Sequence, residues 1–155
     1  MSEESERLLA TLKPEGVAGL DHDIRYLGGN LREALAHYRI LFPELISYRG
    51  GLFIEAHFDR RMVDDLLDAA EFDASGNGIN TAEQHVNGVS LAAEDDENDF
   101  DVEIARANAA AIGWVWTRWF GETYGVEVRV LTSITGSQDC VIWFESGLNN
   151  ENRLG

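Results

Sequence analysis

The sequence predicts an α+β domain in which about six helices pack on a small antiparallel sheet with a C-terminal hairpin. Apolar residues recur at three- and four-residue spacing in several segments, the longest being 102–124, and this spacing is the period of a helix. Residues 52–58 instead place apolar side chains at every second position, as a strand does. Residues 126–134 and 139–145 alternate in the same way on either side of a short turn, which indicates a hairpin.

The length and composition favour a single domain over residues 1–155. A chain of 155 residues with 45% hydrophobic side chains can bury roughly two-thirds of its unfolded surface. The sequence contains no internal repeat and no linker that would divide it.

Three helices are expected before the first predicted strand. The first covers residues 2–12, the second covers 20–27, and the third begins after Asn30 and ends near Pro43. We expect the apolar stripe of the third helix to face the core. This stripe consists of Leu31, Ala34, Leu35, Tyr38, Leu41 and Phe42.

The middle of the chain predicts a strand followed by two helices. Strand 52–58 is expected to join the hairpin as a third strand, because a two-stranded sheet alone is marginally stable. Asp59 can cap the next helix, and the Gly- and Asn-rich segment 73–80 is expected to be a loop. Thr81 and Gln84 have the spacing of a capping box, so a further helix should begin there.

Helix 102–124 carries three of the four tryptophans and is the predicted centre of the fold. We expect Val115 and Trp119 to be core residues, whereas Trp114 and Phe120 fall away from the main stripe. In the hairpin, Cys140 is expected to be a small core residue rather than a nucleophile. The predicted inward stripe of the helix is Ile104, Ala111, Ile112, Val115 and Trp119.

The charge is strongly negative, because 28 acidic residues face 12 basic ones and leave a formal charge of −16. Direct binding to nucleic acid or to an anionic membrane is therefore disfavoured, and a basic protein is the favoured partner. A high-salt cytoplasm would also produce this acidity. The single cysteine and the acidic start predict a cytoplasmic location, and the longest uncharged stretch, 107–117, is too short to cross a membrane.

An acidic tract at residues 94–101 is the main candidate site. Acids next to a helix N-terminus are stabilising, but six exceed what capping requires. We therefore hypothesise a small non-enzymatic protein of the inhibitor, immunity or phage anti-defence type, which blocks a basic partner that itself binds nucleic acid. Trp114 is a candidate for the apolar anchor. The tract contains Glu94, Asp95, Asp96, Glu97, Asp99 and Asp101.

A first alternative is calcium binding, because residues 72–86 resemble the loop of an EF-hand. The resemblance departs from the pattern after the glycine, since Ile79 stands at position seven rather than eight. Position twelve is then Glu83 if one residue is missing, or Gln84 by direct counting. The matching residues at positions one, three, five and six are Asp73, Ser75, Asn77 and Gly78.

A second alternative is an enzyme with an unrecognised site around His22 or His57. Acidic neighbours flank His22 and could orient its ring as a general base. The four histidines lack zinc-ligand spacing, and no glycine-rich phosphate loop is present. The sequence therefore predicts no cofactor and favours binding over catalysis.

Overall fold

The α+β class is confirmed by a computed structural model, which describes residues 2–11, 31–71, 78–91, 102–135 and 139–147. These residues contain five α-helices, where about six were predicted, and the predicted helix 20–27 lies outside them. The helices are α1 (Glu3–Thr11), α3 (Leu31–Leu41), α4 (Arg60–Glu71), α5 (Gly78–Asn87) and α6 (Val102–Tyr124). A single 3-10 turn, η1, spans Glu55–His57.

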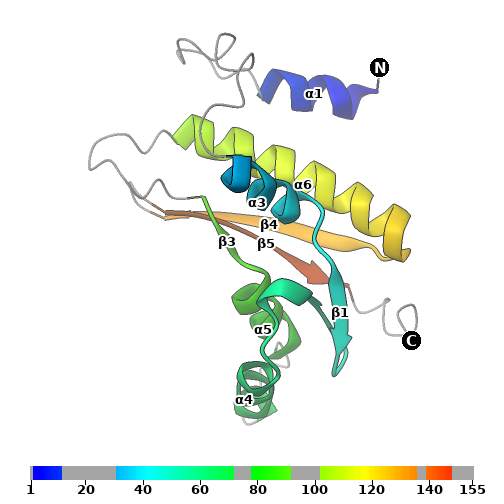
Figure 1. Ribbon diagram of the computed structural model, residues 1–155, viewed down its shortest axis with the longest axis vertical. Helices are drawn as coiled ribbons and strands as arrows, with labels where there is room; N and C mark the ends of the chain where they lie inside the picture. The colour runs from blue at the N-terminus through cyan, green and yellow to red at the C-terminus, as the bar shows by residue number, and fades with distance from the viewer. Residues whose placement is uncertain (1, 12–30, 72–77, 92–101, 136–138, 148–155) are drawn as a thin grey trace.

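The described strands form two antiparallel sheets. One pairs β1 (Leu45–Tyr48) with β2 (Gly51–Ile54), and the other has the order β3-β5-β4. In the larger sheet, α6 covers one face, with α1 and α3 beyond it, while α4 and α5 lie on the other side (Figure 1). Its strands are β3 (Val89–Ser90), β4 (Val128–Thr135) and β5 (Asp139–Ser146).

The predicted C-terminal hairpin is confirmed as β4 and β5, with Val130 opposite Phe144 and Ile134 opposite Cys140. Opposite residues project to the same face of an antiparallel pair. The valines of β4 therefore share the face of Cys140, which is fully buried against α6. Burial raises the pKa of the Cys140 thiol, as expected for a core residue rather than a nucleophile.

The prediction that strand 52–58 joins the hairpin was wrong. The strand ends at Ile54 and pairs with β1, which the sequence did not predict, and β3 is the third strand of the hairpin sheet. The four residues of β1 are too few to show a period of their own. A two-residue turn joins β1 to β2, with positive φ at Arg49 (47°) and Gly50 (84°), as a hairpin turn of this length requires.

Helix α6 has the predicted bounds, but its buried face is rotated from the predicted stripe. Ile104 is 40% exposed and Val115 is only half-buried, whereas Trp116 and Phe120 are inaccessible to solvent. Small residues set this orientation, since a Cβ at Gly113 would lie 3.2 Å from Val130. The residues buried on α6 are Ala105, Ala107, Ala109, Ile112, Trp116 and Phe120.

Helix α3 also departs from the predicted orientation, because its expected core stripe faces solvent. Leu35, Tyr38 and Phe42 are 61%, 45% and 49% exposed. The end of α3 is held instead through its backbone, since the indole nitrogen of Trp116 donates a hydrogen bond of 2.8 Å to the Ile40 carbonyl. This docking places Ile40, which is not in the predicted stripe, against the core together with Leu41, the stripe residue that does pack there.

Two side chains of α5, those of Glu83 and Asn87, form hydrogen bonds with the backbones of both sheets, as an intervening strand would do. The Leu52 amide donates to Glu83 at 2.8 Å, and the Ile54 amide donates to Asn87 at 2.9 Å. The other Glu83 oxygen accepts from the Ser146 amide at 2.9 Å, and Asn87 donates to the Leu52 carbonyl at 2.8 Å. Glu83 and Asn87 are both fully buried, and they join the outer edge of β2 to the end of β5.

This burial predicts a pH dependence of stability. Loss of water around the carboxylate raises the pKa of Glu83, and the hydrogen bonds from Leu52 and Ser146 oppose the shift only in part. The folded state then binds the proton more tightly than the unfolded chain. The stability from this group is fully present below the ordinary carboxyl pKa and is lost as pH rises through the raised one.

The measurement is urea unfolding of the wild type and of Glu83→Gln over about pH 4 to pH 8. Relative to the variant, the wild type should lose stability as the pH rises. Parallel curves for the two proteins would contradict the predicted shift.

Candidate partner-binding groove

The six acidic residues of the predicted site lie outside the described residues, so the structure places only the two ends of their segment. Leu91 precedes the segment, and α6 begins at Val102, directly after it. Trp114 is the one member of the predicted site that is described, three turns along α6. Glu103 lies exposed in the first turn of this helix.

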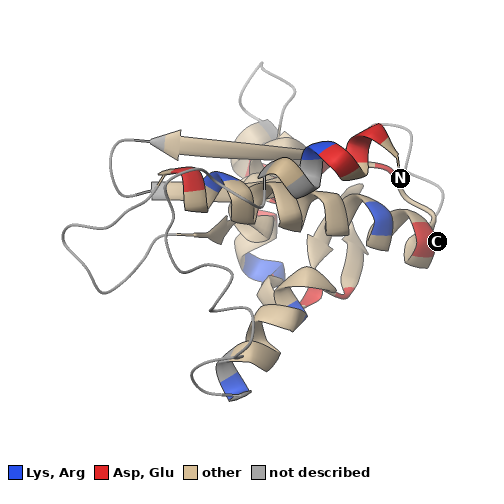
Figure 2. Ribbon diagram, turned by 90° about the horizontal axis from the view of Figure 1, so that it is seen from above, with Lys and Arg blue, Asp and Glu red and all other residues tan. Residues whose placement is uncertain are grey.

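A groove of about 680 Å³ lies between α6, β4 and α1. Strand β4 contributes Val130, Thr132 and Ile134, and α1 contributes Glu4 and Arg7. The side of α6 between Arg106 and Thr117 completes it, with mostly small residues and Trp114. In Figure 2, which looks from above, the long strand at the margin of the larger sheet is β4, and it runs beside α6.

Trp114 provides the unusual polar feature of this groove. Its indole nitrogen is buried and has no hydrogen-bond partner among the described residues. The guanidinium carbon of Arg118 lies 4.6 Å from the ring centroid. Trp114 is therefore a half-buried wall residue rather than a projecting anchor. An unpaired buried donor costs about 1–3 kcal/mol.

The charged residues around the groove occur in pairs of opposite sign. Arg106 contacts Glu103 at 3.0 Å, Arg118 contacts Glu4 at 3.5 Å, and Arg7 is paired with Glu3. All of these side chains are largely exposed, so each pair contributes little to stability. The arginines of the groove are thus balanced locally, and the groove carries no excess of positive charge from these pairs.

A second exposed apolar surface lies on α3. Its large exposed apolar residues are Leu35, Tyr38 and Phe42. Of these, Phe42 also lines a groove of about 460 Å³, to which η1 and β3 contribute. The sequence singled out these residues as a stripe but assigned them to the core. Nothing in the stripe itself distinguishes a buried helix face from an exposed one, because both have the same period.

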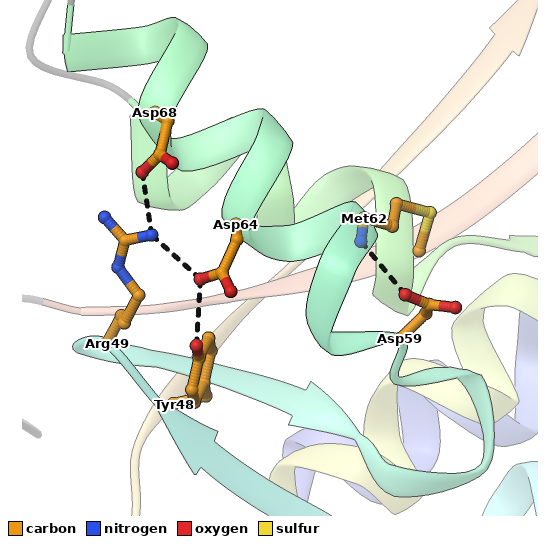
Figure 3. A network of polar contacts seen from close by, with 6 residues as sticks. All are labelled: Tyr48, Arg49, Asp59, Met62, Asp64 and Asp68. Atoms are coloured by element: carbon orange, nitrogen blue, oxygen red, sulfur yellow. Dashed lines mark hydrogen bonds and ion pairs between the residues drawn. The ribbon is translucent and has the colours of Figure 1, made fainter.

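A charged network fixes the β1-β2 turn on α4 and is not a free reactive cluster. Arg49 contacts Asp64 and Asp68 at 2.9 Å each, and the Tyr48 hydroxyl donates to Asp64 at 2.8 Å (Figure 3). These hydrogen bonds from Arg49 and Tyr48 lower the pKa of Asp64. Nearby, Asp59 accepts from the Met62 amide at 3.0 Å, which confirms it as the predicted cap of α4.

The calcium alternative stays a prediction, because Asp73, Ser75 and Asn77 lie outside the described residues. The fourth proposed ligand, Glu83, uses both oxygens to bind Leu52 and Ser146, so a calcium ion would have to displace these bonds. The predicted helix start at Thr81 was wrong, since α5 begins three residues earlier at Gly78.

The positions of the two candidate histidines do not test the hypothesis that the protein is an enzyme. His22 lies outside the described residues, and His57 is exposed in η1 with a ring nitrogen 3.3 Å from the Val86 carbonyl. Within the described ranges, no three histidine, cysteine or acidic side chains are grouped so as to hold a metal ion. In that same part of the chain no helix is both long and apolar enough to cross a membrane.

The groove was not predicted from the sequence, although Trp114 was. Its walls come from α1 at the start of the chain and from the consecutive elements α6 and β4, and only tertiary packing brings them together. The available signal was the row of Ala109, Ala110 and Gly113, whose small size leaves space beside a neighbouring strand. Comparisons with protein-family models, with curated proteins and with solved structures find no match to this chain.

Proposed function

We propose that this protein is a small acidic, non-enzymatic binding protein that docks a basic partner protein and blocks it. The observation that carries the proposal is the groove between α6 and β4, which follows directly after the acidic tract in the chain. The tract supplies charge, and the groove supplies apolar surface that includes the Trp114 ring. Charge and apolar contact play different roles in association, and a stable complex uses both.

The electrostatic part of the proposal rests on where the charge is placed. The tract ends at Asp101, and the groove begins one helical turn later at Arg106. A net charge of −16 attracts a basic surface from a distance and raises the rate of association. The tract would then hold the partner over the end of the groove.

Replacing Asp95, Asp96, Glu97 and Asp99 with Asn or Gln is expected to slow association with the partner. Steering depends on charge, so the wild-type advantage should largely vanish above about 0.5 M salt, where the Debye length is some 4 Å. Partner captured from the native host is the ligand, and surface plasmon resonance at two salt concentrations measures the rates.

A matched control changes the same number of acids elsewhere. Glu44, Glu55, Asp65 and Glu122 are exposed residues remote in sequence from the tract, and their Asn or Gln variants lose the same charge. The control should retain most of the association rate. Equal losses in both variants would mean that the acidity acts only as total charge, as in adaptation to salt, and would overturn the docking role of the tract.

A further inference from the structure

Strand β4 is an outer strand that lacks most of the usual protection of sheet edges. Among the described residues the order is β3-β5-β4, so no strand lies beyond β4. Its eight residues, VRVLTSIT, pair with β5 in continuous register, without a bulge, and contain neither proline nor lysine. Proteins commonly use those devices to prevent strand addition. The one charged residue of β4, Arg129, is paired with Glu145 of β5. Within the part of the chain that the structure describes, β4 therefore offers a long, regular edge for pairing.

The hydrogen bonds of β5 identify which β4 groups face outward. The Cys140 carbonyl accepts from the Leu91 amide, and the Phe144 carbonyl accepts from Asn87, so both point away from β4. Backbone direction alternates along a strand, so the opposed pairs Cys140–Ile134 and Phe144–Val130 are non-hydrogen-bonded pairs. Ile134 and Val130 therefore direct their amide and carbonyl groups to the open edge, as does Thr132 between them.

These same three residues line the groove with their side chains. A strand added to β4 would extend the sheet below the overhanging side of α6. Its alternate side chains would enter the groove, where Ala109, Ala110 and Gly113 leave space.

We propose that the β4 edge binds an extended segment of the basic partner as an additional strand. This inference rests on the proposed function and names the binding mode of its groove. Backbone hydrogen bonds would give affinity, and the groove would select small or medium apolar side chains at alternate positions. A second copy of this chain is a poorer occupant, because each copy carries a charge of −16 and the two would repel.

The test is titration of the isotope-labelled full chain with a synthetic peptide, Lys-Arg-Val-Thr-Val-Thr-Val-Thr-Lys-Arg. Two-dimensional NMR should show shifts of the Val130, Thr132 and Ile134 amides and of the Trp114 indole proton. The three amides should exchange with solvent at least tenfold more slowly when the peptide is bound. A peptide with proline at the central valine should lose these effects, because proline cannot donate to a ladder.

Thr132→Pro is the matched variant of the protein. Its amide faces outward, so no bond to β5 is lost and the fold should persist. The variant should lose peptide binding at least tenfold while the spectrum of the remaining residues is retained. If Thr132→Pro does not fold, exchange protection in the wild type decides. Absence of protection at the three amides at millimolar peptide would overturn strand addition.

Binding of the partner protein by the two variants distinguishes strand addition from the proposed function. Loss of partner binding in both Thr132→Pro and the tract variant supports strand addition to a docked basic protein. Partner binding that survives in Thr132→Pro but falls in the tract variant overturns strand addition and leaves the proposed function standing. Binding that is unchanged in the folded tract variant overturns the proposed function, even if the peptide still pairs with β4.

Discussion

Replacing Glu83 with alanine is expected to lower the free energy of unfolding by about 2–4 kcal/mol. The substitution leaves the buried amides of Leu52 and Ser146 without an acceptor, and each such donor costs about 1–3 kcal/mol. Removal of the buried carboxylate offsets part of this loss, because the free-energy cost of desolvating its charge disappears. The hydrogen bonds that connect β2 to β5 through Glu83 of α5 are lost at the same time.

Urea unfolding at neutral pH measures the effect, with Gln84→Ala as control. Gln84 is the next residue of α5 and is exposed, so its replacement should leave stability nearly unchanged. Asn87→Ala should also be strongly destabilising, since it removes the acceptor of the Ile54 amide. The two losses of stability should not be additive, because both side chains form hydrogen bonds with the backbone of Leu52. A stability of Glu83→Ala within 0.5 kcal/mol or so of the wild type would contradict the bridging role.

Local patterns predicted the longest elements well. The bounds 102–124 agree with α6, and the two strands of the hairpin were predicted to within about two residues at each end. Both segments are long enough for several repeats of their period. Asp59 was also identified correctly, because capping depends on neighbours in the chain.

Features that depend on contacts across the chain could not be predicted. A buried glutamate on a helix reads as a surface residue in the sequence, yet Glu83 serves as a strand substitute between β2 and β5. The face of α6 was misassigned for a related reason. The spacing of apolar residues predicted that Trp119 faces the core. In the structure, the close packing of Gly113 against Val130 turns the helix so that Trp116 is buried instead.

The candidate site was predicted only in its composition. The sequence identified the tract and Trp114, but not Val130, Thr132 or Ile134, which look like ordinary strand residues. Their exposure at an edge follows from the order of the strands, and the pairing of β3 with β5 leaves β4 outermost. That order depends on a two-residue strand, which has no recognisable period.

The largest expected effect on stability is that of Trp116→Ala, about 3–5 kcal/mol, the usual range for emptying a buried tryptophan site. Trp116 is inaccessible to solvent, and its ring contacts Phe120 and Phe144 with centroids 6.2 Å and 5.5 Å apart. The substitution also removes the donor to the Ile40 carbonyl, which holds the end of α3. The melting temperature should fall by about 6 to 20 °C.

Two variants separate the contributions to this effect. Trp116→Phe keeps most of the apolar volume but loses the hydrogen bond to Ile40, so about 1–2 kcal/mol should be lost. Trp119→Ala should cost about 1–2 kcal/mol, since that ring is half-buried, meets Phe42 edge-on at 5.4 Å and donates to Pro43 at 2.9 Å. A larger loss for Trp119→Ala than for Trp116→Ala would restore the original stripe as the buried face. It would then follow that the α6 orientation, and with it the groove over β4, is wrong.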